Sequence, residues 1–335
     1  MGSTAQAEPW PDAQAVTRLA ERLEALWPEG ADADTRLGIA VSGGPDSIAL
    51  LLLVARALPG RVEAATVDHR LRAESAREAA DVAALCERLA VPHATLPVDV
   101  APGNVQAQAR RARYAALRGW IEARGLAALA TAHHADDQAE TLLMRLNRAS
   151  GVAGLAGARA RGIIPGSRIP LLRPVLEWRR VELAGVVAAA GVVAADDPSN
   201  ADDRFDRARL RKALARADWL DIPAVARSAA HLSDADEVVE WAAIREWHEA
   251  VRRTPLGMTY RPRAPRAVVL RVLARIVGEL EGEEPRGGAV ARLFETLAEG
   301  RPASIGDLVA RPDVSGWSFA RAPQRRSENQ APGKS

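Results

Sequence analysis

The sequence predicts an α/β fold, with a Rossmann-like parallel sheet in a larger first domain and a smaller, mainly helical C-terminal domain. Strand-like and helix-like segments alternate through the first half of the chain, which is typical of a parallel sheet covered by helices. After Pro223 the pattern is mainly helical. The chain has 335 residues, enough for two domains, and its 48% of hydrophobic residues can fill their cores.

The first half contains five candidate strands, each a short apolar run that ends at polar residues. In chain order they are Arg36–Val41, Val62–Val67, His93–Val98, Leu126–Thr131 and Ile169–Val175. A helical pattern follows each strand; these helices are 45–58, Ser75–Leu89, Val105–Arg124, Asp136–Asn147 and Arg179–Ala190. In the second helix Val82, Cys86 and Leu89 share one face, so we expect Cys86 to be a core residue.

The second half predicts three helices and a small amount of strand. The helices are Asp234–Arg252, Pro265–Leu280 and Ala289–Ala298, and the strand falls within 301–320. The expected divisions of the chain are an N-terminal extension and helix (1–30), the sheet domain (31–215), the mainly helical domain (216–320) and a disordered tail (321–335). The tail is polar and offers little apolar surface to bury.

Composition limits the class of protein. A single cysteine excludes a disulfide framework and disfavours a multi-thiolate metal site. Met1–Trp10 lacks the features of a signal peptide, and the longest apolar run, Ile48–Ala55, is too short to span a bilayer. We therefore expect a cytoplasmic protein without membrane contact.

Net charge is only +2, so the distribution of charge matters more than its sum. From Ala250 to Gly278 there are seven arginines and no acidic residue. This stretch is either a phosphate-facing surface or a solvated helix face, and the sequence leaves both readings open.

The strongest motif is a glycine-rich loop between the first predicted strand and its helix. The loop consists of Ser42, Gly43, Gly44, Pro45, Asp46 and Ser47. Two glycines allow a tight turn, and the unpaired N–H groups of the following helix can bind an anion such as a phosphate. Asp46 suits such a site when a divalent cation bridges it to the phosphates. The G-x-x-x-x-G-K-S/T and G-x-G-x-x-G patterns are both absent.

Two further clusters carry polar side chains. In His133–Thr141, Asp137 and Glu140 are three residues apart and share a helix face, where they can hold Mg²⁺ or an ammonium group. The spacing does not fit zinc, and a capped helix with an acidic first turn is the alternative. In Asp197–Arg211, a turn precedes spaced arginines that suit phosphate or carboxylate, or a basic surface helix.

The loop resembles the PP-loop of the ATP pyrophosphatase superfamily, whose members release pyrophosphate and leave an adenylate on the substrate. With the other clusters, the chain resembles the tRNA(Ile)-lysidine synthetases within that superfamily. The matching segments, in the family's order, are Ser42–Ser47, 68–72, Ala109–Tyr114, His133–Leu146, Ser150–Gly151, Leu172–Pro174 and Asp197–Arg211. Together they span about residues 36–212.

The resemblance implies a reaction, its cofactors and its partners. ATP, with Mg²⁺, adenylates the C2 carbonyl oxygen of the first anticodon cytidine in an isoleucine tRNA with a CAU anticodon. The side-chain amine of free L-lysine then attacks C2 and expels AMP. The modified anticodon reads AUA in place of AUG. A homodimer is left open.

The resemblance also implies roles for individual residues. The loop residues would hold ATP and its departing pyrophosphate, with Asp46 as the Mg²⁺ ligand and a catalytic residue. Arg113 would stabilise charge on the α-phosphate, and His133 would contact phosphates or move a proton.

The substrate lysine is assigned to the acidic and arginine-rich clusters. Asp137, which is also expected to be catalytic, and Glu140 would bind the lysine. Arg204 or Arg207 would bind its carboxylate.

Small departures and three alternatives accompany this interpretation. The family usually has asparagine at Ala208 and commonly glycine at Ala149, and many bacterial members have a longer C-terminal part that helps to dock the tRNA.

A tRNA-thiolating PP-loop enzyme would require more cysteines than Cys86. An amidotransferase or NAD synthetase would not need the arginine-rich second half. A non-catalytic nucleotide sensor would leave Arg113 and Asp137 without a function.

Overall fold

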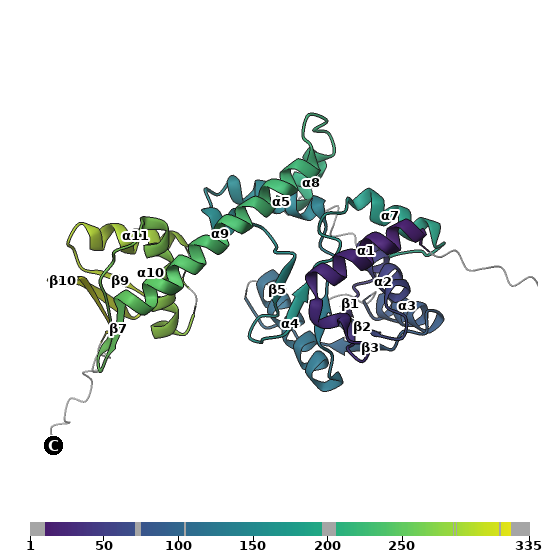
Figure 1. The fold of residues 1–335 in the computed structure, drawn as a ribbon, viewed down its shortest axis with the longest axis horizontal. Coiled ribbons are helices and arrows are strands. Elements are labelled where there is room, and N and C mark those ends of the chain that lie inside the picture. Colours follow the sequence, from purple (N-terminus) through teal and green to yellow (C-terminus); the bar gives the residue numbers. More distant parts are fainter. Residues whose placement is uncertain are drawn as a thin grey trace, which may run out of the picture. The chain divides into compact units, whose positions relative to one another are not determined.

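The computed structural model describes residues 11–70, 75–103, 105–195, 206–283, 285, 287–314 and 316–322. The backbone forms two compact units, Met1–Ser233 and Asp234–Ser335 (Figure 1). The first unit extends past the expected end of the sheet domain at residue 215, because helix α8 (Asp206–Leu214) and the start of helix α9 (Ile222–Ala250) cluster with it. Most of the expected tail, residues 323–335, lies outside the described residues.

The first unit contains the predicted parallel sheet. Its strands are β1 (Leu37–Ala40), β2 (Val62–Asp68), β3 (His93–Pro97), β4 (Ala128–Ala130), β5 (Arg161–Ile163) and β6 (Pro170–Leu172). Their order is β3-β2-β1-β4-β6-β5, and every neighbouring pair is parallel except β5 with β6. The parallel sheet is therefore confirmed, and the antiparallel edge strand β5 was not foreseen, because its three residues show no apolar alternation.

Helices cover both faces of this sheet (Figure 1). Besides α8 and the start of α9, the helices of the first unit are α1 (Ala13–Leu26), the 3-10 turn η1 (Pro28–Ala31), α2 (Pro45–Ala57), α3 (Ser75–Arg88), α4 (Val105–Arg124), α5 (Ala135–Leu146), α6 (Val152–Leu155) and α7 (Arg180–Ala189). Successive side chains of β2 point to opposite faces of the sheet, so each face has its own core. Ala64 packs with α1, α2, α3 and α7 on one face, whereas Ala65 packs with α4 on the other. Gly38 of β1 lets α4 approach closely, since a Cβ there would lie 2.4 Å from Ile121.

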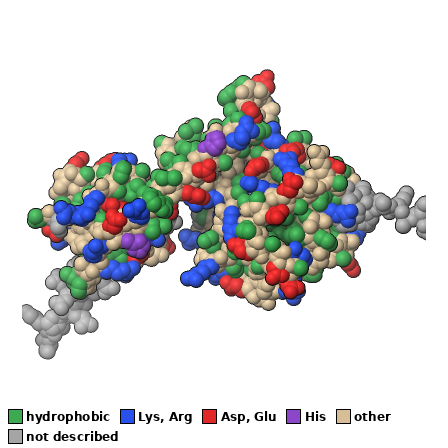
Figure 2. Space-filling view, in the orientation of Figure 1, with side chains coloured by type: hydrophobic (Ala, Val, Ile, Leu, Met, Phe, Trp, Pro, Cys, Tyr) green, Lys and Arg blue, Asp and Glu red, His purple; other side chains and the backbone are tan. Residues whose placement is uncertain are grey.

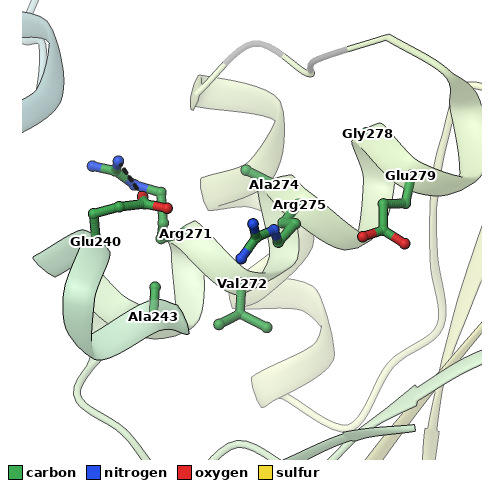
Figure 3. Close-up of a pocket in the computed structure, with 8 residues that line it drawn as sticks. All are labelled: Glu240, Ala243, Arg271, Val272, Ala274, Arg275, Gly278 and Glu279. Carbon is green, nitrogen blue, oxygen red and sulfur yellow. Dashed lines mark hydrogen bonds and ion pairs between the residues drawn. The ribbon is translucent and has the colours of Figure 1, made fainter. Parts of the chain in front are cut away.

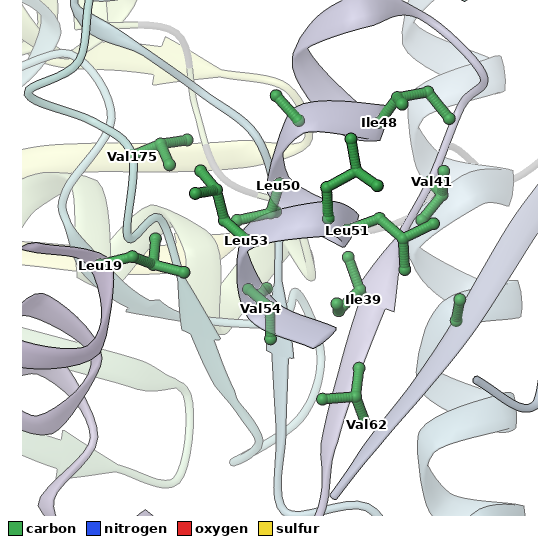
Figure 4. Close-up of a cluster of buried hydrophobic side chains, with 14 of the residues drawn as sticks. Leu19, Ile39, Val41, Ile48, Leu50, Leu51, Leu53, Val54, Val62 and Val175 are labelled. Carbon is green, nitrogen blue, oxygen red and sulfur yellow. The ribbon is translucent and has the colours of Figure 1, made fainter. Parts of the chain in front are cut away.

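Helix α2 is the centre of the larger core (Figure 4). Its residues Ser47–Val54 are all buried, and it packs against α1, α7 and the sheet. Each buried leucine of this helix stabilises the fold by roughly 1.5–3 kcal/mol. Cys86 of α3 is fully buried, and burial raises the pKa of its thiol to about 12, so the prediction of a core residue is confirmed.

The second unit contains the three predicted helices and a larger sheet than expected. It holds the end of α9, β7 (Val251–Thr254), β8 (Gly257–Tyr260), α10 (Arg266–Glu281), α11 (Gly287–Ala298), β9 (Ala303–Ile305), β10 (Leu308–Asp313) and β11 (Gly316–Arg321). The five strands form an antiparallel sheet in the order β7-β8-β11-β10-β9. The hairpin of β7 and β8 turns at Pro255 and Leu256 and was missed, because its strands have only four residues each.

No helix in the described part of the chain is long and apolar enough to cross a membrane.

Candidate active site

The glycine-rich loop lies at the carboxyl end of β1 and opens α2. Gly43 adopts a φ of +89°, in the left-handed region that favours glycine. Ser47 Oγ accepts a hydrogen bond from the N–H of Ser42 (3.1 Å) and donates one to the carbonyl of Gly44 (2.9 Å). The serines thus hold the loop in shape, and the first N–H groups of α2 can bind an anion.

Asp46, in the first turn of α2, faces a histidine that sequence reasoning did not select. His134 is fully buried, and its Nε2 lies 3.3 Å from Asp46 Oδ2 and 3.5 Å from Asp137 Oδ2. His134 also caps α5, because its Nδ1 accepts from the N–H of Asp137 (3.4 Å) and its own N–H donates to the Asp137 carboxylate (3.3 Å). Its position directly before an acidic first turn is the sequence signal for this cap, although only the neighbouring His133 is among the predicted site residues.

Asp46 also carries the feature that a divalent cation would need. Its Oδ1 is buried and has no hydrogen-bond partner among the described residues. The described residues contain no cluster of three side chains that could hold a metal alone. One free carboxylate oxygen beside an anion-binding loop fits Mg²⁺, which proteins often bind through one or two carboxylates together with substrate phosphates.

The predicted carboxylate pair lies on one face of α5 and is held by arginines of α8. Arg207 binds both carboxylates, with Nε 2.6 Å from Glu140 Oε2 and Nη2 2.9 Å from Asp137 Oδ1. Arg211 Nε lies 2.9 Å from the other oxygen of Glu140. Burial alone would raise the pKa of Glu140, but the hydrogen bonds from Arg211 and Arg207 outweigh it and hold this pKa below its ordinary value.

The structure therefore brings Asp46, Asp137, Glu140 and Arg207 into one network through His134. Arg207 contacts the two carboxylates themselves, an arrangement that the sequence did not predict. Arg204, the other candidate for the lysine carboxylate, lies outside the described residues.

His133 lies at the carboxyl end of β4 in a strongly positive environment. Burial, together with the positive charges of Arg173 and Arg113, lowers its pKa to about 3. Its Nδ1 lies 3.1 Å from the hydroxyl of Thr131. A neutral imidazole can hydrogen-bond a phosphate, but it carries no proton to donate as an acid at pH 7.

Arg113 projects from α4, the helix that covers the face of the sheet opposite to α2. Its Cζ lies 5.4 Å from the ring centroid of Tyr114. Burial lowers the pKa of Arg113, and the nearby Arg110 acts in the same direction. The residue still carries a full positive charge at neutral pH.

The arginine-rich stretch of the second unit is partly neutralised. Three of its seven arginines form ion pairs: Arg253 with Glu279, Arg266 with Glu295 and Arg271 with Asp236. Figure 2 shows blue and red side chains interspersed over the visible face. Arg261 and Arg263 are exposed, and their side chains have no acidic partner within the described residues, so they are the members best suited to a phosphate.

A hollow of about 350 Å³ lies between α9 and α10 of the second unit (Figure 3). Its lining residues are Glu240, Ala243, Arg271, Val272, Ala274, Arg275, Gly278 and Glu279. Arg271 is bound to Asp236 and Glu240, and Arg275 lies over the ring of Trp247 at 5.3 Å. None of the predicted site residues lines this hollow, so it is not the candidate active site.

Fold and loop together define a class of protein, the PP-loop nucleotide-binding proteins. The family model described as the PP-loop domain matches residues 14–217. A solved U34-tRNA thiolase from Methanococcus maripaludis has a similar fold, with a TM-score of 0.50 and 12% identity over 65% of this chain and 78% of that chain.

Closer relatives identify the family within this class. A tRNA(Ile)-lysidine synthase of Novosphingobium aromaticivorans is 46% identical over 94% of this chain and 97% of its own. The enzyme of the same name from Zymomonas mobilis is 38% identical over 87% of this chain and 90% of its own. The chain belongs to the tRNA(Ile)-lysidine synthase family.

Proposed function

We propose that this chain joins free L-lysine to C2 of the wobble cytidine in an isoleucine tRNA with a CAU anticodon, using ATP and releasing pyrophosphate and AMP. The product reads AUA in place of AUG. The observation that carries this proposal is the continuous network from the loop through Asp46 and His134 to the carboxylates Asp137 and Glu140. It joins an anion-binding loop to a cation-binding pair, which are the groups that ATP and lysine require.

The loop and Asp46 hold the nucleotide. The N–H groups that open α2 bind phosphate oxygens, and Gly43 leaves room for their close approach. The unpartnered Oδ1 of Asp46 is the ligand for Mg²⁺. When bound, the cation neutralises charge on the phosphates as pyrophosphate departs.

Arg113 and His133 act on the first step, which joins the cytidine to the nucleotide. The C2 carbonyl oxygen of the cytidine attacks the α-phosphorus, and the bond to pyrophosphate breaks. Arg113 stabilises the charge that develops on the α-phosphate. His133, neutral at pH 7, hydrogen-bonds a phosphate oxygen, and the bound phosphate raises its pKa.

Asp137, Glu140 and Arg207 bind the lysine. An ammonium group displaces the guanidinium of Arg207 from the two carboxylates, and Arg207 is then free to bind the lysine carboxylate. In the second step the neutral side-chain amine attacks C2, the bond from C2 to the adenylate oxygen breaks, and AMP leaves. The amine loses a proton in this step to the carboxylate of Asp137, which is the member of the pair that lies beside His134 and Asp46.

Cellular location and assembly complete the proposal. We place the protein in the cytoplasm, where an enzyme that modifies tRNA meets its substrate and where a buried thiol such as Cys86 stays reduced. Assembly as a homodimer stays a prediction.

The test measures pyrophosphate and AMP release from ATP, together with incorporation of labelled lysine. Isoleucine tRNA with a CAU anticodon is compared with a control isoleucine tRNA with GAU. Label that enters only the CAU tRNA, with equal AMP release, supports the proposal. Pyrophosphate release without incorporation would exclude lysine as the nucleophile, and ATP binding without any release would favour the nucleotide sensor.

A further inference from the structure

Three arginines converge on one buried tyrosine at the carboxyl edge of the sheet. Arg110 and Arg113 lie one turn apart on α4, and their Cζ atoms are 5.0 and 5.4 Å from the ring centroid of Tyr114. Arg173 follows β6 directly, and it too interacts with the side chain of Tyr114. We refer to Arg110, Arg113 and Arg173 as the arginine cluster.

No carboxylate of the described residues compensates the charge of the cluster. Within the described residues none of the three arginines forms an ion pair with an aspartate or glutamate. The two side chains that face the cluster, His69 and His133, both have pKa values lowered by burial and by the arginines, so they are neutral at pH 7. A buried positive charge without a counter-ion is costly, so a site of this kind calls for an anion.

Arg173 is the most deeply buried arginine of the cluster. Only 7% of the residue is exposed, and its Nη1 donates to the carbonyl of Arg159 (2.6 Å). Its Nε is buried and has no hydrogen-bond partner among the described residues. The Nδ1 of His69, at the carboxyl end of β2, is likewise buried and without a partner in the part of the chain that the structure describes. Two unsatisfied polar atoms at the edge where such sheets bind ligands indicate an absent ligand and not a finished core.

We propose that Arg173 and Arg110, with Arg113, bind a phosphoryl group in addition to the phosphate held by the loop at residues 42–47. The planar guanidinium matches phosphate oxygens in pairs, and three of them suit a group with more than one negative charge. The inference rests on the proposed function for its two sources of phosphate. They are the terminal phosphates of ATP and the backbone of the tRNA beside the wobble cytidine.

The test uses two variants and one matched control. Arg110→Gln removes an exposed charge without touching the core, and Arg173→Lys keeps the charge but loses the Nε donor. Arg111→Gln removes the same charge as Arg110→Gln from an exposed residue on a different face of α4, and it serves as control. Thermal melting of each variant shows whether the fold is intact. If Arg173→Lys does not fold, the result for Arg110→Gln decides the test.

Two readouts separate the sources. If the cluster binds ATP, the inhibition constant for inorganic pyrophosphate and the KM for ATP both rise. The expected rise is about tenfold in Arg173→Lys and about threefold in Arg110→Gln. If it binds tRNA, those values stay constant, and the slope of log Kd for tRNA against log salt falls by roughly 0.7–0.9 per lost contact. Either result supports a phosphoryl site. The proposal would be overturned if Arg173→Lys and Arg110→Gln both behaved like Arg111→Gln in ATP and pyrophosphate binding and in the salt dependence of tRNA binding.

Failure of the proposed function can be told apart from failure of this inference. If wild-type protein incorporates no lysine into CAU tRNA, the proposed function fails. Weaker pyrophosphate binding in Arg110→Gln would still support the arginine cluster as a phosphoryl site in that case.

Discussion

His134 offers the sharpest test of how the site is assembled, because its two ring nitrogens have different tasks. Nδ1 accepts from the N–H of Asp137 and caps α5, whereas Nε2 lies 3.3 Å from Asp46 Oδ2 and 3.5 Å from Asp137 Oδ2 and forms no hydrogen bond among the described residues. Asparagine places an acceptor where Nδ1 lies, and glutamine places a donor near the position of Nε2. His134→Asn therefore keeps the cap and loses the link between the carboxylates, whereas His134→Gln does the reverse.

The structure sets the size of each effect. Loss of the cap costs about 1 kcal/mol, and the void beside the shorter asparagine costs a similar amount. For a unit of the size of Met1–Ser233, 1 kcal/mol lowers Tm by about 2–4 °C, so both variants should melt within a few degrees of wild type. The contact of Nε2 with the two carboxylates, at 3.3 and 3.5 Å and without a hydrogen bond among the described residues, is assigned about 1.5 kcal/mol, the low end for a charged partner. This corresponds to roughly a tenfold loss of kcat/KM in His134→Asn alone.

The assay measures kcat/KM for lysine incorporation alongside thermal melting. We expect His134→Gln to retain most of its activity and His134→Asn to lose about tenfold, with KM for ATP and for lysine both affected because the link joins their sites. Equal activity of the two variants would refute the reasoning, since it would reduce His134 to a packing and capping residue.

Three further predictions test other parts of the site. Asp137→Ala should abolish lysine transfer while ATP still binds, measured by labelled lysine and by nucleotide titration; normal turnover would contradict the assignment. Charge reversal of Arg261 and Arg263 to Glu should weaken tRNA binding and flatten its salt dependence, whereas unchanged binding would favour a solvated surface. Because the folded pKa of Glu140 lies below its ordinary value of 4.5, its ion pairs stabilise the fold fully above that pH, and this stability is lost as pH falls through the folded pKa. Melting curves should show a smaller acid-side loss in Glu140→Gln than in wild type.

The sheet domain was predictable from the sequence because its signals are local. Each buried parallel strand is an apolar run on its own, and each helix shows its own period, so the order of elements follows without any long-range contact. The second unit lacked such signals. Strands β7, β8 and β9 have three or four residues each, and the pairing of β8 with β11 joins segments about 60 residues apart.

The sequence indicated which residues form the site better than it indicated which contacts they make. Asp46, Asp137 and Glu140 could be selected because loop motifs and helix spacing indicate which residue types share an edge. The role of His134 depends on where β4 places α5 relative to α2, and Arg173 depends on the meeting of β6 with α4. Neither contact leaves a pattern in the sequence, because each joins residues that are more than 50 positions apart.

The pairing of Arg207 with two carboxylates bears on which substrate the site can accept. A ligand with only an ammonium group, such as a diamine, would displace Arg207 from Asp137 and Glu140 and leave its guanidinium beside the newly bound cation. A free amino acid brings its own carboxylate to receive that guanidinium, so the number of ion pairs is conserved on binding. A lysine within a peptide lacks this carboxylate, and it would leave a half-buried arginine unpaired. On the proposed function, the arginine that closes the site in the absence of substrate therefore also favours free lysine over amines without a carboxylate.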